Sequence, residues 1–311
     1  MKKVFNFFKR LYKHFMKLNS WTKLALFLTI ILVILILINK HVPRIEGFTQ
    51  REKFVVKEGT DIYDGFYTSI YDDLVLDTVK NDFEVGEIER LIIKKGRVLD
   101  VGSGKGHHVH LLNKTGYQAE GVDKSSAMVE SASEKYSQYT FKEGDVVESM
   151  LYQPNSFTTV TCMYFTIYYI KEKNQFLQNV YRWLKPGGYF VVHLVNRDRF
   201  DPILNAADPL HMVSAQKHAK KRITNSLVKF KDFQYKANFD LDKSQNLAAF
   251  NETLKDDKSG HVRQNKHILY MEPQKHVLSI AKNIGFILKG KIDMVSTQYH
   301  NQYLYLLYKP E

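Results

Sequence analysis

Apolar and polar positions change their spacing twice along the chain. Residues 24–39, LALFLTIILVILILIN, form an apolar run without a charge. From residue 97 onward, short apolar runs of strand length alternate with stretches of helical spacing. The strand-like runs are Arg97–Val101, Gln118–Val122, Thr140–Lys142, Thr158–Met163 and Tyr189–Val195, and the helix-like stretches begin near Gly106, Ser125 and Lys171. This alternation predicts a parallel sheet covered by helices on both faces.

The C-terminal part predicts the edge of the same sheet. A helix opens after Pro273 and ends at Gly285. The chain then closes with two apolar runs, Phe286–Val295 and Gln302–Tyr308, joined by a short turn. Neighbouring runs of this kind pair as an antiparallel hairpin. The predicted fold class is therefore α/β, with a mixed sheet of seven strands.

Two segments fall outside this alternation. Residues 61–92 have near-helical apolar spacing and predict two helices ahead of the first strand. Residues 198–272 include a run from Phe233 to Leu241 in which apolar and polar side chains alternate strictly, which predicts an amphipathic strand. We interpret 198–272 as a β-containing insertion after the fifth strand, lying over the carboxyl edge of the sheet.

The basic charge of the protein is concentrated at its N-terminus. The formal charge is +12, but residues 1–45 hold nine Lys or Arg and no acidic residue. The remainder has 36 basic against 33 acidic residues, so the folded part is nearly balanced. The single cysteine, Cys162, excludes an intramolecular disulfide. The charge distribution disfavours a nucleic-acid-binding surface.

The apolar run 24–39 is long enough for a membrane anchor. As a helix it measures about 24 Å, and about 30 Å with the four residues before it. We therefore predict a single-pass transmembrane helix at 24–39, a basic amphipathic leader at 1–23 on a lipid surface, a linker at 40–57 and a globular domain at 58–311. A buried core helix or a cleaved signal peptide are the alternatives for the run, and a solvated basic tail is the alternative for the leader.

A glycine turn follows the first strand of the sheet, in the sequence Val98-Leu99-Asp100-Val101-Gly102-Ser103-Gly104-Lys105-Gly106. Such glycines allow a ligand to approach the backbone, and the following helix presents free amide donors. A dinucleotide fingerprint requires glycine at position 107, where this chain has His107. NAD is therefore disfavoured.

These residues resemble the first motif of the class I S-adenosylmethionine-dependent methyltransferases. Asp123 and Asp145 follow the next two strands, and Trp183-Leu184-Lys185-Pro186-Gly187-Gly188 is similar to the family's turn before strand five. The resemblance implies a Rossmann-like sheet, S-adenosylmethionine as cofactor, Asp123 on the ribose hydroxyls and Asp145 on the adenine amino group. The alternative for both aspartates is helix N-capping.

The cofactor-binding set expected from this resemblance extends around the turn. It comprises Asp100, Gly102, Ser103, Gly104, Gly106, His107, His108, Asp123, Lys124, Met128, Asp145, Val146, Met163 and Tyr71. For His107 and His108 we expect contact through the backbone. A metal site is disfavoured because His107, His108 and His110 have no carboxylate near them in sequence.

The acceptor pocket is expected after the fourth strand. No Asn/Asp-Pro-Pro-Tyr motif stands there, and no proline precedes Cys162, so the DNA-methylating classes are disfavoured. Tyr164 and His193 are the candidate catalytic residues; core packing and a hydrogen-bonded buried histidine are their alternatives. By resemblance, Tyr63, Tyr67, Tyr71 and the 198–272 insertion could close over the site.

Together these features predict a membrane-anchored methyltransferase acting on a small-molecule or lipid-phase acceptor by in-line transfer. Membrane lipid is the expected partner, and we expect the domain to face the cytosol, where the cofactor is made. A protein methyltransferase near membranes and a non-catalytic scaffold of the same fold are the alternatives.

Overall fold

The computed structural model describes residues 15–16, 18–41, 52–92, 95–204, 219 and 221–311, with the main chain alone for 34–41. The chain divides into two compact units, Met1–Glu46 and Gly47–Glu311. Parts of three predictions lie outside the described residues: most of the leader, residues 42–51 of the linker, and 205–218 of the insertion.

The larger unit is built on the predicted seven-stranded sheet. Its strand order is β11-β12-β6-β5-β2-β3-β4. Five strands run parallel, and β12 and β11 pair antiparallel at one edge. The strands are β2 (Arg97–Val101), β3 (Gln118–Asp123), β4 (Phe141–Glu143), β5 (Phe157–Cys162), β6 (Leu184–Val195), β11 (Ile287–Asp293) and β12 (Gln302–Tyr308). The mixed sheet and its C-terminal hairpin are confirmed.

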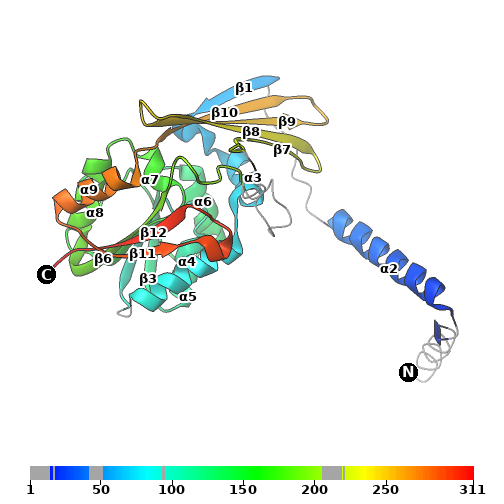
Figure 1. Ribbon diagram of the computed structural model, residues 1–311, viewed down its shortest axis with the longest axis horizontal. Helices are drawn as coiled ribbons and strands as arrows, with labels where there is room; N and C mark the ends of the chain where they lie inside the picture. Colours follow the sequence, from blue (N-terminus) through cyan, green and yellow to red (C-terminus); the bar gives the residue numbers. More distant parts are fainter. Residues whose placement is uncertain (1–14, 17, 42–51, 93–94, 205–218, 220) are drawn as a thin grey trace. The chain divides into compact units, whose positions relative to one another are not determined.

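Helices cover both faces of this sheet, as Figure 1 shows. Helices α4 and α5 pack together on one face, and α8 and α9 pack together on the other. The helices are α3 (Gly65–Val75), α4 (Thr78–Leu91), α5 (His107–Lys114), α6 (Ser126–Lys135), α7 (Thr166–Tyr169), α8 (Lys173–Trp183) and α9 (Gln274–Ile284). Strand residues such as Leu99, Val160 and Phe190 are fully buried between the helix layers, as their apolar runs require.

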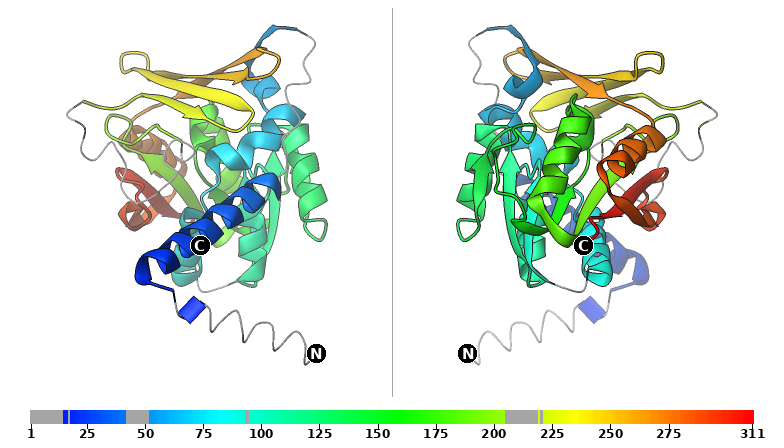
Figure 2. Two further views of the ribbon diagram at one scale, coloured as in Figure 1. Left: turned by 90° about the vertical axis from the view of Figure 1, so that its right-hand side faces the viewer. Right: turned by 90° about the vertical axis from the view of Figure 1, so that its left-hand side faces the viewer.

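A second sheet lies across the carboxyl edge of the first (Figures 1 and 2). Its order is β1-β10-β9-β8-β7. Four strands come from the insertion: β7 (Asn225–Lys229), β8 (Phe233–Asp242), β9 (Leu247–Asp256) and β10 (Val262–Tyr270). The fifth, β1 (Phe54–Glu58), pairs parallel with β10. Residues 54–57 therefore belong to this sheet and not to a linker, because the backbone groups of β1 complete the edge that β10 exposes.

The N-terminal unit contains one long helix, α2 (Ser20–His41), which includes the predicted span at 24–39. Asn19 Oδ1 accepts a hydrogen bond from the Thr22 amide at 2.8 Å and so caps its start. Trp21, Phe27 and Leu32 on this helix are exposed. Over the described residues, no helix combines the length and apolar character needed to cross a bilayer. The predicted transmembrane helix is therefore not confirmed.

Two glycines in this fold allow opposite predictions for the same substitution. Gly86 lies at an exposed position inside α4, and an added Cβ would meet no heavy atom within 4 Å. Gly106 precedes α5 at φ +79°, and its Cβ would fall 2.6 Å from Phe141. We expect Gly86→Ala to raise the free energy of unfolding by about 0.5–1 kcal/mol and Gly106→Ala to lower it by about 2 kcal/mol. Urea unfolding followed by far-UV circular dichroism measures both, and equal effects would contradict this assignment.

Candidate functional site

The glycine turn is anchored to the neighbouring strand by its own backbone. The amides of Gly102 and Ser103 donate to the Val122 carbonyl at 2.8 and 3.0 Å, and the Gly106 amide donates to the Ser103 carbonyl at 2.9 Å. The three glycines of the turn all adopt positive φ: 66° at Gly102, 51° at Gly104 and 79° at Gly106. Other residues rarely adopt this backbone conformation, so the turn itself requires glycine.

Only one of these glycines leaves room for a ligand. A Cβ at Gly102 would collide with Thr166, and one at Gly106 with Phe141. At Gly104 the nearest heavy atom would be Tyr71 Cε1, at 4.0 Å. Gly102 and Gly106 are therefore required by internal packing, whereas Gly104 presents bare backbone to open space. This is the feature a cofactor lying across the turn needs.

Asp123 closes the turn from the end of β3. Its carboxylate accepts the Gly104 amide at 2.9 Å on Oδ2 and the Ser125 amide at 2.9 Å on Oδ1. Burial raises the pKa of Asp123, and these amides offset only part of the effect. Each oxygen keeps a second lone pair for a hydroxyl donor. The cap of α6 is Ser125, which accepts the Met128 amide, so Asp123 is not the helix cap.

Asp145 lies at the corresponding place after β4. Its Oδ2 accepts the exposed Lys124 ammonium at 2.7 Å, and its Oδ1 accepts the Val147 amide at 3.0 Å. Burial opposes ionisation, yet Lys124 and this amide hold the pKa of Asp145 below its usual value. Both predicted acids therefore stand at the same edge of the sheet as acceptors, as an adenosine bearing hydroxyls and an amino group requires. The residues present fit S-adenosylmethionine.

Asp100 acts inside the sheet. It is 2% exposed and accepts the Thr161 hydroxyl at 2.7 Å. Burial raises the pKa of Asp100. This hydrogen bond links Asp100 in β2 to Thr161 in the neighbouring strand β5.

The two predicted histidines point their side chains to helices. His107 Nε2 lies 2.9 Å from Asp72 Oδ1, and His108 Nε2 lies 2.7 Å from Glu84 Oε2. Any contact with a ligand at the turn therefore falls to their backbone. Four further predicted residues are buried beside the turn and the strand ends: Ser103, Met128, Val146 and Met163.

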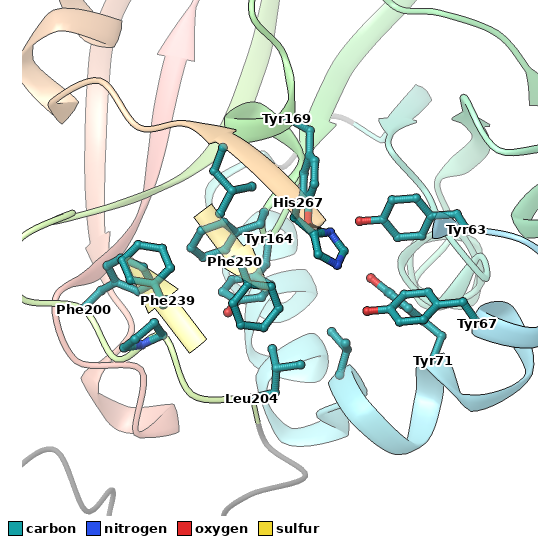
Figure 3. A pocket seen from close by; sticks show the side chains of 14 residues that line it. Tyr63, Tyr67, Tyr71, Tyr164, Tyr169, Phe200, Leu204, Phe239, Phe250 and His267 are labelled. Atoms are coloured by element: carbon teal, nitrogen blue, oxygen red, sulfur yellow. Dashed lines mark hydrogen bonds between the residues drawn. The ribbon is translucent and has the colours of Figure 1, made fainter. Parts of the chain in front are cut away.

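An aromatic pocket, drawn in Figure 3, includes Tyr71, the side chain nearest to Gly104 of the turn. It contains about 550 Å³ of empty space, including its open mouth. Tyr71, expected at the cofactor, and Tyr164, a catalytic candidate, both line it. The full lining is Tyr63, Tyr67, Tyr71, Val75, Tyr164, Phe165, Tyr169, Phe200, Pro202, Leu204, Phe239, Phe250, His267 and Leu269.

The second catalytic candidate, His193, lies outside this lining. It is 1% exposed in β6, where Nε2 lies 3.0 Å from Gln302 Oε1 and Nδ1 lies 3.4 Å from Glu84 Oε1. Burial lowers the pKa of His193. These contacts join β6 to β12 and α4, so the structure places His193 in the core and Tyr164 in the pocket.

Sequence reasoning missed Glu252 and His267. Glu252 in β9 is fully buried, and His267 in β10 lines the pocket. The carboxylate accepts the hydroxyls of Tyr67 and Tyr235 on Oε1, at 3.0 and 2.7 Å. A usable signal was the two-residue period of β9, which places an acid on the same face as Phe250 and Leu254.

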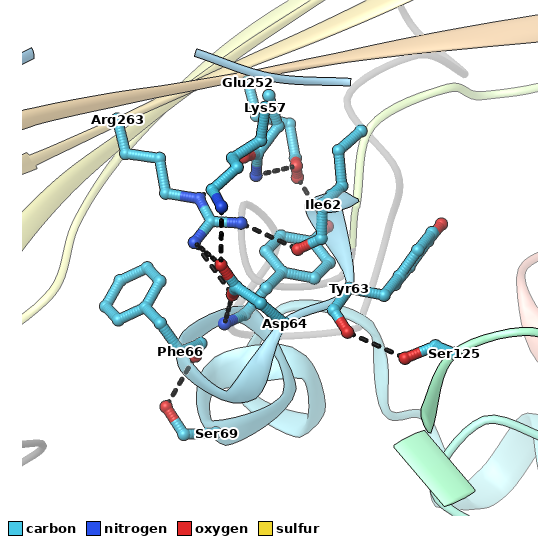
Figure 4. Close-up of polar contacts among 11 residues, drawn as sticks. Lys57, Ile62, Tyr63, Asp64, Phe66, Ser69, Ser125, Glu252 and Arg263 are labelled. Atoms are coloured by element: carbon cyan, nitrogen blue, oxygen red, sulfur yellow. Dashed lines mark hydrogen bonds and ion pairs between the residues drawn. The ribbon is translucent and has the colours of Figure 1, made fainter. Parts of the chain in front are cut away.

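An ion pair between buried Arg263 and half-buried Asp64 joins the second sheet to the start of α3 (Figure 4). Arg263 Nη1 lies 2.9 Å from both carboxylate oxygens of Asp64, and Nη2 donates to the Ile62 carbonyl at 2.7 Å. On the other side, the Ser125 hydroxyl donates to the Tyr63 carbonyl at 2.7 Å. The segment that carries Tyr63 and Tyr67 is thereby held between the second sheet and the glycine turn.

Comparison with known proteins agrees with this geometry. A family described as "Methyltransferase domain" matches residues 92–271, more than half of the chain. The chain is 32% identical over 142 residues to a carboxy-S-adenosyl-L-methionine synthase of Campylobacter curvus, covering 42% of this chain and 59% of that protein. It is 26% identical over 154 residues to a dTDP-4-amino-2,3,4,6-tetradeoxy-D-glucose N,N-dimethyltransferase of Saccharopolyspora spinosa, covering 47% and 58%. The matches thus span less than two thirds of either relative.

The fold has solved counterparts. An S-adenosylmethionine-dependent methyltransferase from Clostridium acetobutylicum superposes with a TM-score of 0.60 over 79% of this chain and 98% of that one, at 16% identity. The predicted Rossmann-like methyltransferase fold and the predicted cofactor, S-adenosylmethionine, are confirmed by these likenesses.

The role of Asp123 is testable by ligand binding. We expect Asp123→Asn to weaken S-adenosylhomocysteine binding to the full chain at least tenfold, because one acceptor becomes a donor that opposes ribose hydroxyls or the turn amides. Asp82→Asn, exposed in α4, is the matched control. Isothermal titration calorimetry measures both, and unchanged affinity in the Asp123 variant would refute the assignment.

The Arg263 contacts predict a measurable stability effect. Arg263→Ala should lower the free energy of unfolding by about 2 kcal/mol, because the Ile62 carbonyl loses its donor, whereas the half-exposed Asp64 keeps Lys57 and the Tyr67 amide. Lys266→Ala on the same strand removes an exposed pair with Glu58 and should cost less than about 1 kcal/mol. Urea unfolding measures the loss in free energy of unfolding for both variants, and equal losses would contradict the larger contribution assigned to Arg263.

Proposed function

Because the chain belongs to the methyltransferase-domain family, we propose that it transfers a methyl group from S-adenosylmethionine to a small-molecule acceptor held in the aromatic pocket. One observation carries the proposal. Tyr71, the residue nearest to the open side of Gly104, is also part of the pocket lining. The cofactor turn and the pocket therefore share a wall, as transfer between two bound molecules requires.

Some residues of the site would hold the cofactor, and others would keep water away from the acceptor. When bound, the cofactor supplies a methyl carbon activated by a sulfonium; the acceptor's lone pair forms the new bond, and the electron pair of the broken bond stays on sulfur. Gly104 and Asp123 would hold the adenosine part. Phe200, Phe239 and Phe250 exclude water from the acceptor side.

The pocket favours a small acceptor over a protein side chain. Its lining is mostly apolar and aromatic with a few polar groups, the composition typical of small-molecule sites. The relative from Saccharopolyspora spinosa is named for an amino-sugar nucleotide, an acceptor of this size class. A protein substrate would have to thread a side chain beneath the second sheet, and a non-catalytic scaffold would have no need for a lined pocket beside the turn.

We also propose that this activity is tethered to a membrane, with the domain facing the cytosol. The uncharged run 24–39 and the exposed apolar side chains of α2 support this. A tether raises the local concentration of a lipid-phase acceptor.

The tether is testable in the full chain. Leu28→Lys with Leu32→Lys should abolish co-flotation with anionic liposomes, because each charge opposes insertion. Leu227→Lys, at an exposed apolar position of β7, should leave flotation unchanged. Flotation of all three proteins alike would contradict the proposal.

Methyl transfer itself is tested by isotope. The full chain is incubated with methyl-labelled S-adenosylmethionine and separated lipid, small-molecule and protein fractions. We expect label in the small-molecule or lipid fraction. Label confined to protein would overturn the acceptor class, and cofactor binding without label in any fraction would indicate a scaffold.

A further inference from the structure

Three side chains from different elements form a hydrogen-bonded line that ends in the aromatic pocket. The Tyr169 hydroxyl, from α7, lies 2.9 Å from His267 Nδ1. His267 Nε2 lies 2.8 Å from Glu252 Oε2 in β9. In Figure 3 the hydroxyls of Tyr63 and Tyr169 point toward the space beside the His267 ring. The order of groups is hydroxyl, imidazole and carboxylate, the order used by proton relays in other enzymes.

The carboxylate end of this line is held as an anion. Besides His267, Glu252 accepts the Tyr67 and Tyr235 hydroxyls, at 3.0 and 2.7 Å, and the Asn265 amide at 2.9 Å. Burial opposes its ionisation, yet His267 and these donors hold the pKa of Glu252 below its ordinary value. A carboxylate that only accepts requires a proton on His267 Nε2. The Nδ1 lone pair is then left to accept from Tyr169.

The hydroxyl end of the line is open. Tyr169 is 37% exposed, whereas Tyr67 and Tyr235, the other tyrosines in the network, are 2% and 0% exposed. While the Tyr169 hydroxyl donates to His267, its oxygen still has two lone pairs, and the Tyr63 hydroxyl is the neighbouring donor. Tyr169 is therefore the member of the network that an acceptor molecule can reach.

We infer that Tyr169, His267 and Glu252 take the proton that the methyl acceptor must lose, and that this acceptor is a protonated amine. The inference rests on the proposed methyl transfer. The N–H bond of the ammonium breaks and its electron pair stays on nitrogen. The proton joins the Tyr169 oxygen as the tyrosine's own proton moves to His267 Nδ1, and Glu252 stabilises the resulting imidazolium. The proton later leaves to water by the reverse path.

The pocket favours an amine by its charge pattern. Among the lining residues that the structure describes, five are tyrosines and none is Asp, Glu, Lys or Arg. Aromatic faces attract a cation, and an ammonium cannot attack carbon until it loses a proton. An alcohol would gain nothing from the aromatic faces. The aromatic lining would bind the ammonium, and the line from Tyr169 through His267 to Glu252 would remove its proton.

The relay also explains why tyrosine acts with histidine. Burial raises the pKa of Tyr169, so a free tyrosinate is disfavoured there. The proton must reach His267 in the same step. The titratable groups facing His267 are Glu252 from β9, Tyr169 from α7, Tyr67 from α3, and Tyr63 just before α3.

The acceptor class is tested without turnover. Cyclohexylamine and cyclohexanol, which match in shape, are titrated against the full chain loaded with S-adenosylhomocysteine and followed by ligand-observed NMR. We expect the amine to bind at least tenfold more tightly. Equal affinity, or tighter binding of the alcohol, overturns the amine assignment.

The relay is tested by nitrogen NMR of the ¹⁵N-histidine-labelled full chain. His267 is identified by the signal lost in His267→Gln, with exposed His276→Gln as the control. We expect the Nε2–H form, and Tyr169→Phe should move the Nδ1 resonance alone. A proton on Nδ1, or a resonance indifferent to Tyr169→Phe, refutes the relay.

Steady-state kinetics distinguish failure of the proton relay from failure of the proposed methyl transfer. With the amine acceptor, Tyr169→Phe and Glu252→Gln should lower kcat at least 100-fold while the KM for S-adenosylmethionine stays within threefold. Tyr181→Phe, in α8 away from the pocket, should change neither. If Glu252→Gln does not fold, Tyr169→Phe decides alone. Full activity in Tyr169→Phe would refute the relay while methyl transfer remained established. Absence of transfer in the unmodified chain would refute the proposed function itself.

Discussion

A carboxylate in an apolar interior is stable only when every lone pair finds a donor, and Glu252 imposes this constraint on the larger unit. Tyr67 from α3, Tyr235 from β8, and Asn265 and His267 from β10 are its hydrogen-bond partners in the described part of the chain. Removing any of those elements would take away at least one donor from a fully buried charge, at a cost of about 1–3 kcal/mol. The second sheet, the α3 segment and the pocket wall are therefore bound to form together.

Arg263 extends the same constraint toward the cofactor turn. Its guanidinium reaches Asp64, the Ile62 carbonyl and Asn265, and Asn265 in turn donates to Glu252. Ser125, which follows Asp123, holds the Tyr63 carbonyl. A continuous set of polar contacts thus runs from the end of β3 to the interior of the second sheet. Because each group in it is buried or half-buried, the distance between turn and pocket has little freedom to vary.

A second buried acid organises the opposite side of the turn. Glu84 in α4 is fully buried and accepts Lys80 at 2.9 Å and His108 at 2.7 Å, with His193 at 3.4 Å. Burial opposes its ionisation, but Lys80 and the two histidines hold the pKa of Glu84 well below its usual value. This cluster joins helices α4 and α5 to strand β6 of the sheet that they cover. It accounts for two histidines that would otherwise invite a catalytic or metal-binding interpretation.

The sequence by itself determined the elements that depend on local spacing. Strand runs such as Arg97–Val101, the helix ending before Gly285 and the terminal hairpin all follow from periods of 2 and 3.6 and from glycine or proline at their ends. The positions of Gly104, Asp123 and Asp145 were likewise readable, because a turn and two strand ends place them at one edge of a parallel sheet.

Only the tertiary structure decided which polar side chains meet. Tyr169 and His267 are 98 residues apart, and Asp64 and Arg263 are 199 apart. No periodicity relates positions so distant, since their contact depends on how the second sheet folds back over the first. The same packing moved His193 into the core and joined β1 to β10. Local patterns predict the helices and strands because each pattern acts within one element. The chemistry of the pocket depends on contacts between elements, which no local pattern encodes.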